Sequence, residues 1–194
     1  MKKNNGGYSL IELVVIMAIV AILSGVFVYN LGRISGFQAK ECRKKVYSSL
    51  TNGQLITLSK SRGGVSDSDS AGTYLLLFKN TDDGCNYCYT IVEHEITDVK
   101  KISKGKVTIE VSYSADGSGS VAIGTNTGLK NVGDDDSSLN GVRVAYSRQN
   151  GAFLPNGTGD YIYKIYAKAG MYQYEISLHP KTGRVEIGER SRLD

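Results

Sequence analysis

The sequence predicts an α+β protein in which a long N-terminal α-helix, transmembrane in its first half and amphipathic in its second, packs on a C-terminal antiparallel β-sheet head. Three observations predict this. Residues 10–31 form an apolar run, residues 32–61 carry apolar side chains at helical spacing, and the remaining chain contains short segments rich in Tyr, Val, Ile and Thr. A helix followed by a series of strands is typical of α+β proteins.

The composition limits the class of protein. A chain of 194 residues with 41% hydrophobic residues, 23 Gly and 2 Pro can hold one ordinary domain and an attached segment, and it is neither collagenous nor wholly disordered. The 23 basic residues nearly balance the 19 acidic ones, and no long Lys/Arg run is present. The net charge of +4 therefore indicates no nucleic-acid surface.

The apolar run from Leu10 to Leu31 contains one charged residue, Glu12. As a helix rising about 1.5 Å per residue it would be about 33 Å long, which is enough to cross the hydrocarbon of a bilayer. A secretory signal peptide is the alternative, but its apolar region would be shorter and would be followed by a small-residue cleavage site. The sequence favours a membrane-spanning helix.

Glu12 requires a partner, because a carboxylate in a membrane-spanning helix costs about 2.5 to 3.5 kcal/mol on insertion scales. The nearest basic residues, Lys3 and Arg33, lie outside the apolar run. A free α-amino group close to Glu12 would supply the missing cation, if the chain began shortly before it.

The segment around Glu12 offers such a terminus. It reads Gly6-Gly7-Tyr8-Ser9-Leu10-Ile11-Glu12, after a short leader containing Lys2 and Lys3 and before the apolar helix. This combination resembles the prepilin motif of type IV pilins and type II secretion pseudopilins, over about residues 1–60. The resemblance implies that a prepilin peptidase cleaves between Gly7 and Tyr8, that the new amine of Tyr8 is methylated, and that Glu12 pairs with the Tyr8 amine of a neighbouring subunit.

Two features depart from the family pattern. Tyr8 stands where most members have Phe, and no Pro precedes Pro155, whereas many members have one late in the apolar helix. Ser24-Gly25 and Gly32 are the positions at which the helix could open, but nothing forces it to do so. We therefore expect a smoothly continuous helix.

The chain divides into four predicted segments: a leader (1–7), a transmembrane and assembly helix (8–31), an amphipathic continuation of the helix (32–61) and a β-rich head (62–194). The helix is expected to stop near Arg62-Gly63-Gly64. The apolar stripe predicted to pack on the sheet comprises Leu31, Ile34, Cys42, Val46, Leu50 and Leu58. The expected strands are 73–79, 87–96, 106–113, 142–146, 161–167, 172–178 and 184–187, with a hairpin joining 161–167 to 172–178.

A long Gly/Ser/Asn/Asp-rich loop is predicted at 114–141, with a short strand near 121–123. Loops of this length are often functional. This loop is therefore the place where a ligand of the head, whether a surface, a sugar or DNA, would be sought.

Charge counting and the motif disagree about orientation. Arg33, Lys40, Arg43, Lys44 and Lys45 follow the apolar run closely, and counting them would place the head in the cytoplasm. The prepilin motif instead implies a single-pass precursor in the cell membrane with its head outside, and an extracellular pilus after assembly. We expect the orientation that the motif implies.

Three cysteines, Cys42, Cys85 and Cys88, would lie in a compartment where disulfides persist. A Cys85–Cys88 disulfide is the preferred interpretation, and a link from Cys42 to either is the alternative. A zinc site would need Cys85 and Cys88 with His94 and His179, but only the cysteine half has a familiar spacing.

The sequence offers little other chemistry. Acidic clusters at Asp67/Asp69, Asp82/Asp83 and Asp134–Asp136 could serve calcium, but they match no ligand spacing and are interpreted as solvated turns. Glu93-His94-Glu95 is interpreted as part of a strand, and no catalytic motif is present. We expect no enzyme, no cofactor, no metal and no catalytic residue.

The sequence therefore predicts a structural subunit: a pilin-like protein processed by prepilin peptidase, held in the membrane before assembly, and polymerised with other pilin subunits through its N-terminal helix. The alternatives are a low-abundance minor pilin or tip adhesin that binds a surface or DNA, and a pseudopilin of a type II secretion system.

Overall fold

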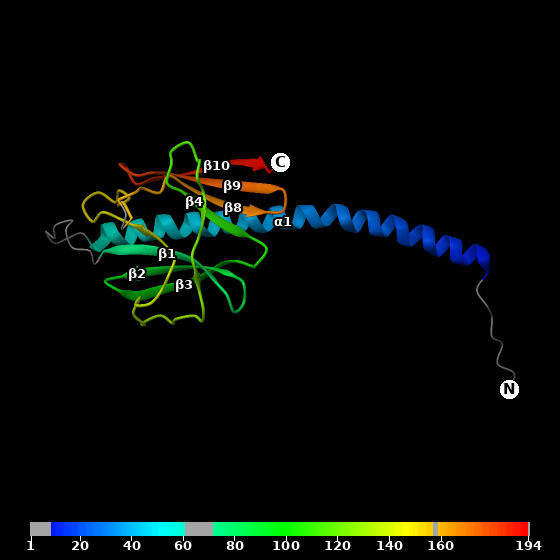
Figure 1. The fold of residues 1–194 in the computed structure, drawn as a ribbon, viewed down its shortest axis with the longest axis horizontal. Coiled ribbons are helices and arrows are strands. Elements are labelled where there is room, and N and C mark those ends of the chain that lie inside the picture. Colours follow the sequence, from blue (N-terminus) through cyan, green and yellow to red (C-terminus); the bar gives the residue numbers. More distant parts are fainter. Residues whose placement is uncertain (1–8, 61–71, 157–158, 194) are drawn as a thin grey trace, which may run out of the picture. The chain divides into compact units, whose positions relative to one another are not determined.

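The fold was obtained as a computed structural model that describes residues 9–60, 72–156 and 159–193 (Figure 1). The chain forms two compact units, Met1–Ile34 and Ser35–Asp194, and each is described by itself. From Ser35 onwards, the second unit contains both the predicted amphipathic part of the helix and the predicted head. The second half of the helix is therefore an integral part of the head.

One helix, α1, runs from Leu10 to Lys60. It starts with a hydrogen bond from the amide of Leu13 to the carbonyl of Ser9. No Pro occurs within it, so each later residue can donate its N–H to the preceding turn, and the predicted continuity is confirmed. The predicted stop at Arg62-Gly63-Gly64 lies outside the described residues.

The second half of α1 presents one buried face to the sheets. Ala39, Cys42, Val46 and Leu50 are at most 1% exposed and belong to the main core cluster. The predicted stripe is confirmed at Cys42, Val46 and Leu50. It is wrong at Leu58, which is 41% exposed. At about 100° per residue, Leu58 is rotated about 80° from the direction of Leu50, whereas the buried Thr57 is rotated only about 20°.

Two sheets make up the rest of the head. The first has the order β3-β2-β1-β6, with β7 also paired to β1; its strands are β1 (Thr73–Asn80), β2 (Asn86–Val92), β3 (Glu95–Ser103), β6 (Thr125–Asn126) and β7 (Val142–Ala145). The second has the order β10-β9-β8-β4-β5; its strands are β4 (Thr108–Ser112), β5 (Val121–Ala122), β8 (Lys164–Ala169), β9 (Tyr172–His179) and β10 (Arg184–Arg192). Every pairing is antiparallel except β1 with β6, so the predicted α+β class is confirmed.

The main core lies where α1 meets both sheets. It contains side chains from the first sheet, such as Leu75 and Val144, and from the second, such as Val111 and Ile176, together with the buried face of α1. Figure 1 shows the two sheets on either side of the second half of α1 in that view. The helix therefore supplies part of the core that each sheet needs on its inner face.

The first sheet is buried on its other face as well. A second cluster there includes Leu76, Phe78, Tyr89 and Ile91, and Leu139 from the long loop packs against it. This explains why β1 is an unbroken apolar run rather than an alternating one. It also means that the loop is a structural cover for the sheet.

The predicted strands correspond to the observed ones, with one error of type. The segment 87–96 is a hairpin, in which β2 and β3 are joined by a turn at Glu93 and His94. Both turn residues have positive φ, 52° and 67°, which is the conformation that two-residue hairpins favour. The interpretation of Glu93-His94-Glu95 as part of a strand is therefore wrong for Glu93 and His94, whereas Glu95 is the exposed first residue of β3. The predicted hairpin between β8 and β9 is confirmed.

Candidate functional site

The processing site can be placed only in the sequence, because Gly7 and Tyr8 lie outside the described residues. Glu12 is described, and it occupies the first turn of α1, where its side chain is exposed. A carboxylate in the first turn of a helix interacts favourably with the free N–H groups there. The structure therefore places Glu12 within one helical turn of the start of α1, at the end that carries the prepilin motif.

The apolar segment that follows Glu12 exposes large hydrophobic side chains around the helix. The segment Leu10–Phe27 has a mean hydropathy of 2.8, and its length and composition are sufficient to cross a membrane. Its exposed large hydrophobic residues are Leu10, Ile11, Leu13, Val14, Val15, Ile16, Met17, Ile19, Val20, Ile22, Leu23, Val26 and Phe27. A helix that is apolar on all sides is stable only when lipid or other helices surround it.

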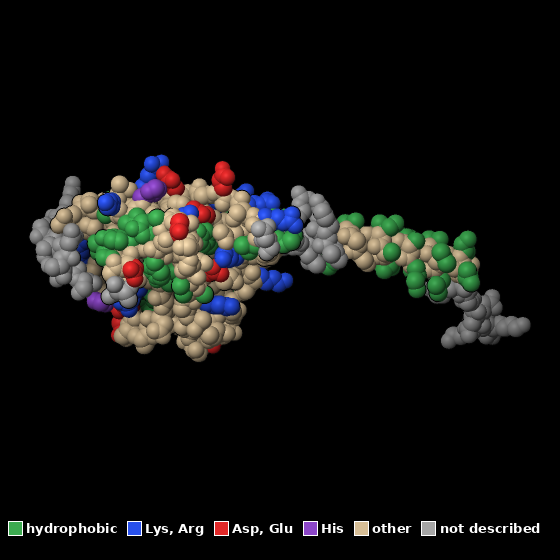
Figure 2. All heavy atoms as spheres, turned by 45° about the horizontal axis from the view of Figure 1, so that its top comes forward, with side chains coloured by type: hydrophobic (Ala, Val, Ile, Leu, Met, Phe, Trp, Pro, Cys, Tyr) green, Lys and Arg blue, Asp and Glu red, His purple; other side chains and the backbone are tan. Residues whose placement is uncertain are grey.

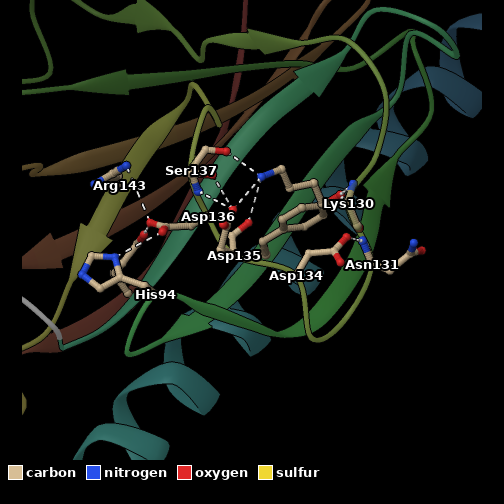
Figure 3. A network of polar contacts seen from close by, with 10 residues as sticks. His94, Lys130, Asn131, Asp134, Asp135, Asp136, Ser137 and Arg143 are labelled. Carbon is tan, nitrogen blue, oxygen red and sulfur yellow. Dashed lines mark hydrogen bonds and ion pairs between the residues drawn. The ribbon is translucent and has the colours of Figure 1, made fainter.

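The head carries a second candidate site in the predicted loop 114–141. Part of this loop, near residues 130–137, is held by the polar network of Figure 3. Asp136 is buried, with a side chain 8% exposed. It accepts a hydrogen bond from the hydroxyl of Tyr74, lies 3.1 Å from His94 Nδ1, and forms an ion pair with Arg143 at 3.8 Å. These partners tie the loop to β1, to the turn between β2 and β3, and to β7.

The neighbouring carboxylates hold the loop to itself. Lys130 Nζ donates to Asp135 Oδ1 at 3.0 Å and to the carbonyl oxygens of Asp135 and Ser137, at 3.0 and 2.6 Å. Hydrogen bonds from Ser137 and the ammonium of Lys130 lower the pKa of Asp135 to about 2. Asp134 accepts a hydrogen bond from the amide of Asn131 at 2.7 Å. The three consecutive aspartates therefore have three different structural roles.

A buried tyrosine fastens the middle of the loop. The hydroxyl of Tyr89 donates to the carbonyl of Lys130 and accepts from the amide of the same residue, both at 3.1 Å. Burial of this phenol raises its pKa. Tyr74, Tyr89 and Arg143 were not predicted as site residues. Tyr89 and Tyr74 act through contacts 41 and 62 residues away in the chain, which have no local signal, and Arg143 acts through its ion pair with Asp136.

A polar depression lies beside this network, with a volume of about 270 Å³. Its lining comes from 125–130 and 138–140 and is mostly Thr, Asn, Ser and backbone. The two sides are joined by hydrogen bonds from Asn126 Nδ2 to the carbonyl of Asn140 and from the Asn140 amide to Asn126 Oδ1, at 2.5 and 2.7 Å. Such a surface offers hydrogen-bond donors and acceptors but no aromatic face for stacking.

The cysteines are free thiols in the structure. Cys85 belongs to the second cluster, on the other face of the first sheet, and Cys88 belongs to the main core cluster. The predicted Cys85–Cys88 disulfide is therefore absent. The physical reason is the spacing: residues three apart in an extended chain point to opposite faces. Burial raises the pKa of Cys42 and of Cys88 to about 12.

The described residues do not bring together the predicted zinc ligands or a calcium site. His94 lies beside Asp136, and His179 lies 3.4 Å from Glu186 on the second sheet. Among the described residues no group of three His, Cys, Asp or Glu side chains could hold a metal ion. Asp67 and Asp69 lie outside the described residues. Asp83 accepts a hydrogen bond from the hydroxyl of Tyr87 and forms an ion pair with Lys101.

Comparison with known proteins identifies the N-terminal segment. Residues 2–28 match the family model described as the prokaryotic N-terminal methylation motif, which is the signature of type IV pilins and pseudopilins and confirms the resemblance seen in the sequence. No curated protein and no solved structure matches the chain. The motif and the apolar helix together are consistent with a membrane-anchored precursor that is processed by prepilin peptidase and assembles with other pilin subunits.

Proposed function

We propose that this protein is a structural subunit of an extracellular type IV pilus or a related filament. The observation that carries the proposal is the match of residues 2–28 to the methylation motif, directly joined to a helix whose apolar side chains are exposed. In the precursor the bilayer covers these side chains. In the filament, the helices of neighbouring subunits cover them instead.

Processing would create the charge that Glu12 lacks. Cleavage between Gly7 and Tyr8 removes the leader and leaves an amine at Tyr8, four residues before Glu12. Methylation of the Tyr8 amine keeps its positive charge. Four residues correspond to about 6 Å along a helix, so the amine of one subunit reaches Glu12 of the next after a shift of about one turn. Pairing offsets the cost of burying each charge separately.

The head stays on the assembly helix because α1 continues into its core. Leu50 and Val46 are buried among residues of both sheets, so the head cannot detach from α1 without exposing this core. Polymerisation through the first half of α1 would therefore carry the folded head to the filament surface, outside the cell.

The test is a substitution that removes only the charge of Glu12. Glu12→Gln should leave cleavage intact, so that Edman sequencing or mass spectrometry still finds Tyr8 as the first residue. Filament number, counted by electron microscopy of sheared fibres, should fall at least tenfold. Glu41→Gln is the matched control, because Glu41 is an exposed carboxylate on the same helix outside the apolar segment. Normal filament number in Glu12→Gln, or a first residue other than Tyr8 in the wild type, would contradict the proposal.

A minor subunit at the filament tip is a second candidate, and the polar depression beside the loop favours it. Its ligand would be a surface, a sugar or DNA. Thr127 is exposed and lines the depression, so Thr127→Tyr should fill it. If the protein is an adhesin, this variant should lose binding while filament number stays normal, and immunogold labelling should mark only fibre tips. Labelling along the whole fibre indicates the major subunit instead.

A pseudopilin of a type II secretion system would share the same N-terminal chemistry. Deleting the gene then abolishes export of the secreted enzymes while surface fibres remain. The same deletion removes the fibres if the protein is the major pilin. In either system, a protease added outside intact cells should reach the head, and a head protected from that protease would contradict the proposed orientation.

A further inference from the structure

A cluster of cations lies at one end of the head, where Ser35 begins the second compact unit. Its members, called here the basic end, are Lys40, Lys44 and Lys45 from α1 and Arg190 and Arg192 from β10. Lys40, Lys44, Lys45, Arg190 and Arg192 are all exposed. Figure 2 shows Lys and Arg side chains gathered over this end of the head.

Contacts between α1 and the second sheet bring these cations together. A Cβ on Gly36 would lie 2.7 Å from the ring of Tyr172, which places the start of β9 directly against α1. Tyr172 pairs with Arg192 in the sheet register, and the guanidinium of Arg190 lies 4.0 Å from the centre of the Tyr172 ring. The end of β10 and residues 36–45 of α1 therefore share one end of the head.

The cations of the basic end have no carboxylate partner among the described residues, unlike several other lysines of the head. Lys101, Lys130, Lys164 and Lys168 each form an ion pair at 3.2 Å or less. In the described parts of the chain no such pair involves any of the five cations of the basic end. Glu41 and Glu189, the acidic residues on the same segments, leave the basic end with an excess of positive charge.

Two exposed apolar side chains lie among these cations. Phe37, one turn before Lys40 and Glu41, is 63% exposed, and Met171, whose sulfur accepts a hydrogen bond from Arg192, is 50% exposed. Apolar and aromatic groups beside Lys and Arg are typical of protein segments at a membrane surface. The basic end therefore has both components of such a surface.

The position of the lysines in the chain indicates that the binding partner is the membrane surface. Lys40 follows Phe27, the last residue of the candidate membrane span, by 13 residues, and Lys45 follows it by 18. Basic residues within about 15 to 20 residues of a span count towards its orientation, and clusters of them next to a span are attracted to anionic lipids. The same lysines oppose the predicted orientation when charges are counted, so their presence there needs a separate explanation.

We propose that the basic end binds the phosphate groups of anionic phospholipids in the membrane that holds the precursor's apolar helix. This inference rests on the membrane-anchored precursor of the proposed function but not on filament formation. Ammonium and guanidinium groups form charge-assisted hydrogen bonds to phosphate oxygens. Each basic residue next to an anionic surface contributes about a fivefold factor to binding, and the contribution falls as salt is added.

The experiment uses the full-length precursor in vesicles of phosphatidylcholine, alone or with about one-third phosphatidylglycerol, without peptidase or other subunits. Lysines are acylated with a small amine-reactive reagent, and the rates are read by mass spectrometry. Phosphate pairing stabilises the unreactive ammonium, so Lys40, Lys44 and Lys45 should react at least threefold more slowly in the anionic vesicles. This protection should disappear in about 0.5 M salt.

Lys60 and Lys181 are internal controls, since both are exposed and lie near the other end of the head, where the β9–β10 turn contacts α1 at Gln54. Their rates should be equal in both kinds of vesicle. A double substitution, Lys40→Gln with Lys44→Gln, should restore the rate at Lys45 in anionic vesicles, whereas Lys60→Gln with Lys181→Gln should not.

Equal rates for the basic end in both vesicles, or equal protection of Lys60 and Lys181, would overturn the proposal. So would a loss of filaments in the double variant without any change in labelling, because the basic end would then serve contacts between subunits. Protection in the precursor stands even if no filament forms, so the two proposals fail separately.

Discussion

Replacing Leu50 by Ala should destabilise the head strongly, because Leu50 lies at the centre of the contact between α1 and the two sheets. The side chain is 0% exposed and belongs to the main core cluster. Leu→Ala substitutions in cores cost about 2 to 5 kcal/mol, the larger values applying where the surroundings cannot collapse. Leu50 is bounded by a helix and by two hydrogen-bonded sheets, so we expect about 3 kcal/mol. For a unit of this size that lowers the Tm by about 6 to 12 °C.

Leu55→Ala is the matched control. Leu55 is on the same helix but is 65% exposed, and Leu and Ala have similar helix propensities. Its substitution should change the free energy of unfolding by less than about 0.5 kcal/mol. Both variants are measured as full-length protein in detergent by near-ultraviolet circular dichroism, which reports on the head because most tyrosines belong to it. Equal Tm values for the two variants would refute the packing of α1 against the sheets.

Three further predictions concern the loop and the cysteines. Tyr74→Phe removes a donor to the buried carboxylate of Asp136 and should lower the free energy of unfolding by about 1.5 to 3 kcal/mol in urea denaturation, whereas Tyr161→Phe, at an exposed site, should have little effect. Hydrogen bonds lower the pKa values of Asp116 and Asp135 from 3.8 to about 2, so the stability that they contribute is present above about pH 4 and is lost as the pH falls towards 2. The protection of the amides of residues 131–137 against hydrogen exchange, measured relative to the intrinsic exchange rate at each pH, should fall over that interval, and Asp135→Asn should remove much of this loss of protection. Cys42 and Cys88, with pKa values raised to about 12, should resist alkylation at pH 7.5 in the native protein, and the intact mass should not change on reduction; a mass increase of two hydrogen atoms on reduction would instead show a disulfide.

The helix and the general layout could be predicted because their signals are local. The apolar run and the motif before it need no knowledge of distant residues, and the spacing of Cys42, Val46 and Leu50 follows from helical periodicity alone. The prediction from periodicity was wrong at Leu58, because the sequence pattern does not distinguish an apolar residue beside the buried face from one on it. The buried residue is Thr57, whose hydroxyl donates a hydrogen bond to the carbonyl of Gly53 at 2.8 Å.

The hairpin turn at Glu93-His94 could not be predicted from residue preferences, since two-residue turns with positive φ favour Asn and Gly. Tertiary contacts explain its position. The carbonyl of His94 accepts a hydrogen bond from the Asp136 amide at 3.0 Å, and Glu93 forms an ion pair with Arg148 at 3.5 Å. The loop 114–141 could be predicted only as a surface loop, because its Gly, Ser, Asn and Asp residues show no apolar period. Its role as a cover for the first sheet depends on Leu139, Lys130 and Asp136 meeting residues far away in the chain.

The apolar stripe of α1 draws the helix to the sheets, but it does not by itself fix the position of the helix along its axis, because dispersion and burial are not directional. Four hydrogen bonds fix that position. Arg43 Nη1 donates to the carbonyl of Gly188 at 2.7 Å, Gln54 Nε2 donates to the carbonyls of Gly151 and Gly183 at 2.9 and 3.1 Å, and the hydroxyl of Tyr146 donates to the carbonyl of Leu50 at 2.8 Å.

These bonds join α1 to β10, to the turn before β10 and to the residue after β7, at three levels along the helix. A shift of the head by even one residue along α1 would break them together and leave buried carbonyls unpaired. The exposed side of the helix, including Phe37 and the three lysines of the basic end, is therefore always presented in the same position relative to both sheets. In the proposed filament, this fixed position would allow every subunit to repeat the same contacts.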